Sequence, residues 1–338
     1  MNMKAIVIDG AFGLENLKVE ERPVPTPGPE QVLVRMSAAS LNFRDLLTVK
    51  GAYNPRQPLP LIPGSDGVGE VVALGAGVTR VKMGQRVGTC FCQGWVAGPP
   101  TRERLSNTLG GPLDGTLAQY MVLDQQGVVA LPGHLTNEQA ATLTCAALTA
   151  WTALVTEGQL KAGSWVLLQG TGGVSIFALQ LARLLGARVI ITSSSHEKLA
   201  RARELGAEHT INYLEEPRWG KKARQLTGGR GVDQVVEVGG ADTLAQSLSA
   251  VAVGGQISLI GVLSGVKSSV LLTQILMQYV RVQGILVGNR DGFEAMNRAV
   301  AASGLKPVVD RVFGLEDTAE ALAYMASGKH LGKVCIKM

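Results

Sequence analysis

The sequence WVLLQGTGGVS, at residues 165–175, joins an apolar run typical of a buried strand to the start of an apolar helix. Glycine lets the backbone turn tightly and approach a pyrophosphate, whose charge the N–H groups and dipole of the following helix stabilise. The motif therefore predicts a dinucleotide site with contacts at Gly170, Thr171, Gly172, Gly173 and Val174. Ser175 occupies the third glycine position of the G-x-G-x-x-G pattern. The alternative is a tight turn that binds no ligand.

Strands and helices alternate regularly after this turn. Short apolar runs predict strands at residues 165–169, 188–192, 210–212, 232–238 and 256–260. Helical spacing predicts helices at residues 174–185, 197–205, 218–226 and 243–253. Strict alternation implies right-handed crossovers. The pattern therefore predicts an α/β fold with a doubly wound parallel sheet covered on both faces, the Rossmann fold.

The first part of the chain, to about residue 125, has short alternating runs bounded by glycine and proline, such as residues 31–36 and 67–72. These strand signals have no regular helices between them and predict a small antiparallel or barrel-like β domain. A helix is expected at residues 137–154 after Thr136, a suitable N-cap. After residue 285 the pattern is mixed, with helices near residues 293–303 and 317–327 and a last strand at 333–337.

Composition and charge exclude several classes of protein. The chain has 338 residues, of which 46% are hydrophobic and 17% charged, enough for two domains with large cores. The net charge of +5 is spread thinly and lacks interleaved aromatic residues, so nucleic-acid binding is not expected. No apolar run is clean enough to span a membrane, and the first residues indicate a strand rather than a signal peptide. Four cysteines make no disulfide framework, which favours a cytoplasmic protein.

The segment after the second predicted strand of the sheet reads TSSSHEK at residues 192–198. Enzymes that use NAD place an acidic residue at this tip for the ribose 2′-hydroxyl, and no acid stands there. A 2′-phosphate needs hydrogen-bond donors and a cation instead. The residues predicted to bind the 2′-phosphate of NADPH are Ser193, Ser194, Ser195 and Lys198. In the alternative interpretation the serines cap the next helix and Lys198 is solvated.

Four motifs carry a resemblance to a known family. They are NFRD at residues 42–45, PGSDGVG at 63–69, CAALTAW at 145–151 and the glycine turn. In order and spacing they resemble the medium-chain dehydrogenase/reductase superfamily over nearly the whole chain. The nearest likeness is to zinc-independent quinone oxidoreductases, enoyl reductases and related proteins often labelled alcohol dehydrogenases.

The resemblance implies two domains and an assembly. Residues 131–287 are expected to form the Rossmann dinucleotide-binding domain. Residues 1–130 and 288–338 are expected to form a GroES-like β-barrel domain with the catalytic and substrate site. The resemblance also implies a homodimer joined through the nucleotide-binding domains.

The positions of the catalytic metal ligands are changed in this chain. By resemblance, zinc-dependent relatives have a cysteine where this chain has Asn42. They have a histidine and a glutamate where it has Ser65 and Asp66. Only Cys145 keeps a cysteine that such relatives often use. One thiolate and one carboxylate cannot build a catalytic zinc site with three protein ligands, so no metal is expected.

Without a metal, reduction of a conjugated carbonyl or a quinone is easier than oxidation of an alcohol. Hydride adds to carbon while charge spreads onto an oxygen that donors can stabilise. The resemblance to enoyl reductases implies that Tyr53 donates a hydrogen bond or a proton. The alternative is a loop tyrosine packed beside Pro55. Asn42 is predicted to contact the nicotinamide ribose or the substrate oxygen.

The remaining candidates come from the same resemblance. Family positions beside the nicotinamide are Thr149, Val262, Leu263 and Asn289. For the last three of these the alternative is ordinary packing at a strand end. Asp45 is expected to hold local structure through an arginine, and Lys333 near the C-terminus is a further candidate.

These features predict an NADPH-dependent, zinc-independent oxidoreductase that transfers hydride to a small-molecule enone or quinone. An alcohol dehydrogenase or carbonyl reductase is the second hypothesis, and it requires a metal or a strong general acid. The third hypothesis is an NADPH-binding protein with little catalysis and a structural, sensor or RNA-binding role.

Overall fold

The computed structural model describes residues 1 to 338, and they divide into two units. Unit 1 consists of Met1–Leu148 and Gly288–Met338, and unit 2 consists of Thr149–Val287. Residues 131–148, which the sequence assigned to the dinucleotide-binding half, lie in unit 1. The physical reason is packing, because the helix α2 at Asn137–Ala141 lies against strands of unit 1.

Unit 2 contains a sheet of six parallel strands in the order β10-β9-β8-β11-β12-β13. The strands are β8 (Trp165–Gln169), β9 (Arg188–Ser193), β10 (His209–Asn212), β11 (Val232–Glu237), β12 (Val251–Leu259) and β13 (Arg281–Gly284). The strand order reverses between β8 and β11, as in a doubly wound sheet. The predicted parallel α/β fold is therefore confirmed.

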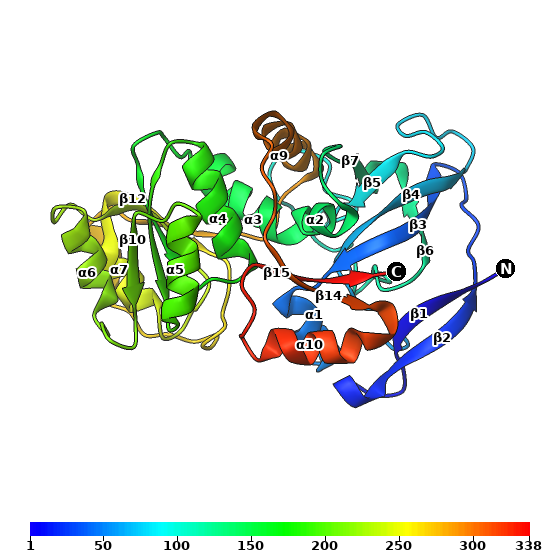
Figure 1. The fold of residues 1–338 in the computed structure, drawn as a ribbon, viewed down its shortest axis with the longest axis horizontal. Helices are drawn as coiled ribbons and strands as arrows, with labels where there is room; N and C mark the ends of the chain where they lie inside the picture. Colours follow the sequence, from blue (N-terminus) through cyan, green and yellow to red (C-terminus); the bar gives the residue numbers. More distant parts are fainter. The chain divides into compact units, whose positions relative to one another are not determined.

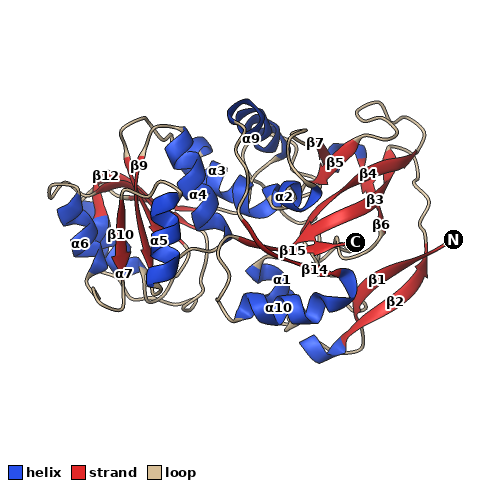
Figure 2. Ribbon diagram, viewed as in Figure 1, coloured by secondary structure: helices blue, strands red, loops and turns tan.

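Four helices cover the two faces of this sheet (Figures 1 and 2). One face carries α4 (Gly173–Leu184) and α5 (His196–Glu204). The other carries α6 (Trp219–Leu226) and α7 (Leu244–Ala250). Right-handed crossovers require this change of face where the strand order reverses. All five residues of β8 are buried, as expected for a central strand covered on both sides.

The end of unit 2 differs from the sequence prediction. The helix expected at residues 243–253 ends at Ala250. Val251 already belongs to β12, because it pairs with Val232 of β11. The helix α8 (Leu272–Met277) and the edge strand β13 are absent from the prediction, since no clean hydrophobic period marks this part of the chain.

Unit 1 is built around a seven-stranded, mainly antiparallel sheet in the order β14-β15-β3-β4-β5-β7, with β6 also paired to β3. These strands are β3 (Gln31–Ser40), β4 (Asp66–Leu74), β5 (Arg86–Thr89), β6 (Tyr120–Asp124), β7 (Val128–Ala130), β14 (Val309–Gly314) and β15 (Lys333–Lys337). A separate antiparallel pair is formed by β1 (Asn2–Ile8) and β2 (Leu17–Pro23). The pairing of β15 with β3 brings the last residues of the chain beside the end of β3.

Helices of unit 1 include one that the sequence prediction lacks. The short helix α1 (Phe43–Val49) interrupts the part expected to contain strands only. Its start is fixed by the Asp45 carboxylate, which accepts a hydrogen bond from the Asn42 backbone N–H at 2.8 Å. The expected late helices are present as α9 (Arg290–Ser303) and α10 (Thr318–Ala326).

The predicted helix at residues 137–154 is a chain of short helical segments. Thr136 caps α2 as predicted, because its hydroxyl accepts a hydrogen bond from the Gln139 backbone N–H. The Gln139 side-chain oxygen in turn accepts a hydrogen bond from the Thr136 N–H. A π-helical turn, the short α3 (Leu148–Trp151) and a second π-helical turn follow. None of the helices in the chain has the length and apolar character needed to cross a membrane.

Candidate functional site

The glycine turn of unit 2 lies between the end of β8 and the start of α4. Gly170 has φ +68°, a left-handed conformation that favours glycine. Gly172 caps α4 in an extended conformation that any residue can adopt. A Cβ atom built on either residue would meet no atom within 4 Å. Packing inside the chain therefore does not explain the glycine at position 172.

Ser175 has a defined role in place of the third glycine. Its side chain is buried, and its hydroxyl donates a hydrogen bond of 2.6 Å to the Gln169 carbonyl oxygen at the end of β8. The first turn of α4 is thereby tied to the strand that precedes the glycine turn. The close helix-to-strand approach that a third glycine normally permits is replaced here by a hydrogen bond.

A buried carboxylate that the sequence reasoning missed lies where the strand order reverses. Glu237, at the end of β11, is fully buried and accepts hydrogen bonds from the backbone N–H groups of Gly239 and Gly240 at 2.8 and 2.9 Å. The Gln169 amide donates to the same carboxylate at 2.7 Å and so joins the ends of β8 and β11. The signal for this network is a polar residue ending each of two apolar strands.

The serines after β9 have internal partners. Ser193 is buried and its hydroxyl accepts a hydrogen bond from the Ser195 N–H at 3.3 Å. Ser195 caps α5 by accepting one from the Lys198 N–H at 3.3 Å. Capping, the alternative interpretation, is thus present for Ser195. Ser194 is exposed. A hydroxyl group that accepts one hydrogen bond can still donate another. The Ser193 and Ser195 hydroxyls therefore keep the capacity to donate to a phosphate.

The other unit 2 candidates differ in exposure. Thr149 is buried, whereas Val262 and Leu263 are 46% and 56% exposed just after β12. Parallel strands end at the same edge of a sheet. The glycine turn after β8, the serines at the end of β9 and the apolar pair after β12 therefore share that edge.

Asn289 belongs to unit 1, where it caps α9. Its side-chain oxygen accepts a hydrogen bond from the Gly292 N–H at 2.8 Å, and its amide nitrogen donates to the Gly98 carbonyl oxygen at 3.3 Å. Asn289 therefore has a local role at the start of a helix. The alternative to cofactor contact in the sequence analysis was ordinary packing, which did not include this cap.

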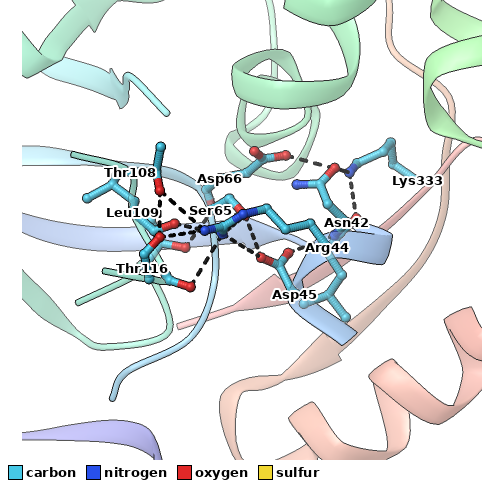
Figure 3. A network of polar contacts seen from close by, with 12 residues as sticks. Asn42, Arg44, Asp45, Ser65, Asp66, Thr108, Leu109, Thr116 and Lys333 are labelled. Atoms are coloured by element: carbon cyan, nitrogen blue, oxygen red, sulfur yellow. Dashed lines mark hydrogen bonds and ion pairs between the residues drawn. The ribbon is translucent and has the colours of Figure 1, made fainter. Parts of the chain in front are cut away.

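Three polar side chains from distant parts of the sequence converge in unit 1 (Figure 3). The buried Lys333 ammonium donates hydrogen bonds to the Leu41 carbonyl oxygen at 2.5 Å and to Asn42 Oδ1 at 2.6 Å. It also lies 3.5 Å from Asp66 Oδ2. A buried cation is therefore held between Asn42, Asp66 and the Leu41 carbonyl group.

Burial raises the pKa of the Asp66 carboxyl, and the Lys333 charge is the largest influence in the opposite direction. The Cys145 thiol lies against the same carboxyl group. Burial and this acidic neighbour raise the pKa of Cys145 well above its usual range.

Tyr53 lies on the face of a guanidinium group. The Arg44 side chain stands 4.6 Å from the centre of the Tyr53 ring and 4.9 Å from that of Phe91. It also donates to the carbonyl oxygens of Leu109 and Gly111 at 2.8 and 2.6 Å. The Tyr53 ring is thus held by Arg44 although 46% of the residue is exposed.

The expected structural role of Asp45 is visible in the same region. Its carboxylate accepts hydrogen bonds from the Asn42 N–H and the Ser65 hydroxyl, and Arg44 lies 3.9 Å away. Burial raises the pKa of Asp45, and the Arg44 charge opposes that shift.

Asn42, Ser65, Asp66 and Cys145 do not fit a zinc ion. Asn42 and Ser65 are weak donors for zinc, which leaves one thiol and one carboxyl group. The Lys333 ammonium beside Asp66 would repel a second cation. No group of three or more histidine, cysteine, aspartate or glutamate side chains with the geometry of a metal site occurs elsewhere in the chain.

Family models match most of the chain. Residues 28–133 match the alcohol dehydrogenase GroES-like domain, and residues 173–302 match the model described as zinc-binding dehydrogenase. A zinc-type alcohol dehydrogenase-like protein of Schizosaccharomyces pombe is 43% identical, with 100% of both chains covered.

Solved structures agree with this assignment. A putative alcohol dehydrogenase from Sinorhizobium meliloti is 44% identical, with a TM-score of 0.94 and coverage of 100% of this chain and 98% of the other. A crotonyl-CoA carboxylase/reductase in complex with NADP is 25% identical, with a TM-score of 0.90 and coverage of 99% and 94%. Together with the doubly wound sheet of unit 2, these matches show that the chain belongs to the medium-chain dehydrogenase/reductase family, whose members are oxidoreductases.

Proposed function

We propose that this chain is an NADPH-dependent, zinc-independent reductase of conjugated carbonyls or quinones. The observation that carries the proposal is the Asn42–Asp66–Lys333 cluster, because its donor set and charge do not suit a metal ion. Protein hydrogen-bond donors are then left to polarise the substrate oxygen. The likeness to a crotonyl-CoA carboxylase/reductase that binds NADP supports the same chemistry.

In this proposal unit 2 binds the dinucleotide. The glycine turn, from Gly170 to Val174, holds the pyrophosphate at the N-terminus of α4. The 2′-phosphate accepts hydrogen bonds from Ser193, Ser194 and Ser195 and pairs with Lys198. The residues proposed to contact the nicotinamide end are Thr149, Val262, Leu263 and Asn289.

Unit 1 supplies the groups that act on the substrate. NADPH, when bound, delivers a hydride to the carbon β to the carbonyl, and negative charge develops on the substrate oxygen. The Asn42 amide and the Tyr53 phenol donate hydrogen bonds to that oxygen, and Tyr53 is the proposed proton donor. For a conjugated carbonyl the hydride and the proton would give the enol, which tautomerises to the saturated carbonyl compound. For a quinone one hydride and one proton would give the hydroquinone.

Single-turnover kinetics test the proposal. Enzyme loaded with NADPH is mixed in a stopped-flow instrument with cyclohexenone, benzoquinone and the saturated ketone cyclohexanone, with and without a chelator. We expect loss of the NADPH absorbance with the first two compounds only, unaffected by the chelator. Oxidation by cyclohexanone that the chelator abolishes would indicate a metal-dependent carbonyl reductase. Binding of NADPH with no oxidation by any compound would indicate a protein without this catalysis.

We also propose that two copies associate through the free edge of the unit 2 sheet. The helix α8 and the residues on either side of it, next to the edge strand β13, carry apolar side chains that are 69% to 85% exposed. They are Leu271, Leu272, Leu276, Met277 and Tyr279. An exposed apolar patch beside the free edge of a sheet is typical of an interface. Sedimentation should give a dimer for the natural chain and a monomer for Leu276→Glu, with Met83→Glu as an exposed control. A monomeric natural chain would reject this interface.

A further inference from the structure

We infer that Lys333 is a positioning residue that turns the Asn42 side-chain amide so that its NH₂ group faces the ligand. Lys333 itself does not touch the substrate or cofactor in this inference and acts through Asn42. The role rests on the proposed function, because the ligand oxygen belongs to the substrate or to the nicotinamide ribose.

The contacts of Lys333 are those of a buried anchor. It is only 3% exposed at the start of β15, and 291 positions separate it from Asn42. Its ammonium faces three oxygen atoms, of Leu41, Asn42 and Asp66. An ammonium has three donors and no acceptor. Two of them form hydrogen bonds with Leu41 and Asn42, and the Asp66 carboxyl group is a more distant ion-pair partner.

The chemistry of the ammonium decides which way the Asn42 amide points. Lys333 can only donate, so the amide oxygen must face it, as the 2.6 Å distance to Oδ1 requires. The reversed amide would place an NH₂ group against an ammonium. The Asn42 amide nitrogen is consequently directed away from Lys333.

That nitrogen is buried and has no hydrogen-bond partner of normal geometry in the chain. It lies on the Asp66 carboxyl side and lowers the pKa of that group as a side-chain donor, although the contact is too long or bent for a normal hydrogen bond. An amide NH₂ has two donors. The Asp66 contact leaves this buried group incompletely satisfied, so a ligand oxygen would complete its hydrogen bonding.

The backbone of Asn42 is held independently of its side chain. The Asp45 carboxylate accepts from the Asn42 N–H at 2.8 Å where α1 begins. Lys333 holds the amide at the other end of the residue. The Asp66 carboxylate compensates the charge of the buried Lys333 ammonium, and its Oδ2 atom lies 3.5 Å from the Lys333 nitrogen. Removing Lys333 should therefore free the amide and the Leu41 carbonyl oxygen, while the Asp45 carboxylate still holds the Asn42 N–H.

Three variants separate anchoring from folding. Lys333→Met removes the anchor, and Lys337→Met is the matched control on the exposed end of the same strand. Lys333→Met combined with Asp66→Asn removes both buried charges. The double variant therefore contains no buried carboxylate without a cation, which would destabilise the fold. Asn42→Asp keeps an oxygen for Lys333 but replaces the NH₂ donor by a second oxygen.

The readouts are the melting temperature, the dissociation constant of NADPH, and kcat and KM with cyclohexenone. We expect kcat/KM to fall by about 100-fold, the effect of losing one preorganised donor, in Asn42→Asp and in both Lys333 variants. Asn42→Asp and the double variant should melt close to the natural chain, and Lys337→Met should be unchanged throughout. Natural activity in the well-folded double variant would overturn the inference.

A double-mutant cycle with Asn42→Ala tests whether Lys333 acts through Asn42. In the Asn42→Ala background, Lys333→Met should change kcat/KM by less than about 2-fold, because coupled residues are not additive. Independent effects that multiply would show that Lys333 contacts the ligand itself.

Failure of the proposed function can be told from failure of this inference. If the natural chain binds NADPH but does not oxidise it with cyclohexenone, the cycle is measured on the NADPH dissociation constant. A shared, non-additive weakening by the Asn42 and Lys333 variants supports the positioning role at the ribose. Unchanged NADPH affinity in all of them, in the absence of turnover, overturns it.

Discussion

Ser175 illustrates how one residue departs from a motif without loss of the local structure. The sequence marks it as a departure from the glycine pattern, and the structure places its hydroxyl 2.6 Å from the Gln169 carbonyl oxygen. A hydrogen bond to the strand end thus stands in for the small size of glycine. The same hydrogen bond is expected to contribute to the free energy of unfolding.

Replacement of Ser175 by alanine should lower the free energy of unfolding by about 1 kcal/mol, because a buried hydrogen bond is lost. Urea denaturation followed by circular dichroism measures this change. Ser194→Ala, on the exposed tip after β9, is the control and should stay within about 0.5 kcal/mol of the natural chain. Equal stability of all three proteins would mean that the Ser175 hydroxyl contributes nothing.

Lys198 carries the prediction on cofactor choice. If it pairs with the 2′-phosphate, Lys198→Ala should weaken NADPH binding by about 1–3 kcal/mol, the range of a charge-assisted hydrogen bond, and leave NADH binding almost unchanged. Fluorescence titration with each dinucleotide gives both constants. Lys222→Ala, on the exposed side of α6, should alter neither. A similar loss of affinity for NADH and NADPH would show that Lys198 does not contact the 2′-phosphate.

At the scale of elements, local patterns located most strands and helices to within a few residues. The strands at residues 165–169 and 333–337 agree with β8 and β15, because each is a short apolar run bounded by clear turn or loop residues. The predicted helix at 243–253 is too long, because pairing of Val251 with β11 outweighs its place in a helical period. The short helix α1 has too few residues to show a period.

The segment between residue 157 and β8 contains a strained position that can be tested. Gln159 has φ +48°, in the left-handed region that disfavours a side chain. Gln159→Gly should raise the free energy of unfolding by about 0.5 kcal/mol, since relief of strain exceeds the added freedom of the unfolded chain. Gln159→Ala keeps a Cβ atom and should give no gain. Equal stability of the two variants in urea denaturation would contradict strain at this residue.

At the scale of the whole molecule, all four cysteines lie in the interior. Burial raises the pKa of Cys90, Cys92 and Cys335 to about 12, and the pKa of Cys145 lies well above the ordinary value. Raised pKa values keep the thiols protonated at neutral and mildly alkaline pH, so the reactive thiolate is scarce.

Iodoacetamide at about pH 8 should therefore leave the native chain unmodified over the time in which an exposed cysteine reacts fully. Mass spectrometry should then find four modified cysteines only after denaturation in urea. Fast modification of one thiol in the native protein would show that its surroundings open to solvent.

Sequence alone was sufficient to identify the glycine turn and the regular alternation around it. Each of these is a local feature, because a turn and a hydrophobic period are visible within a short window. The expectation that no metal binds came from the resemblance to a family and stays a prediction. Contacts between segments that are distant in the chain cannot be recognised within a short window of sequence. Gln169 with Glu237, and Lys333 with Asn42, meet only because strand pairing brings them together. The direction of the Asn42 amide was thus decided by tertiary structure, since it depends on an ammonium that is a neighbour in space and not in the chain.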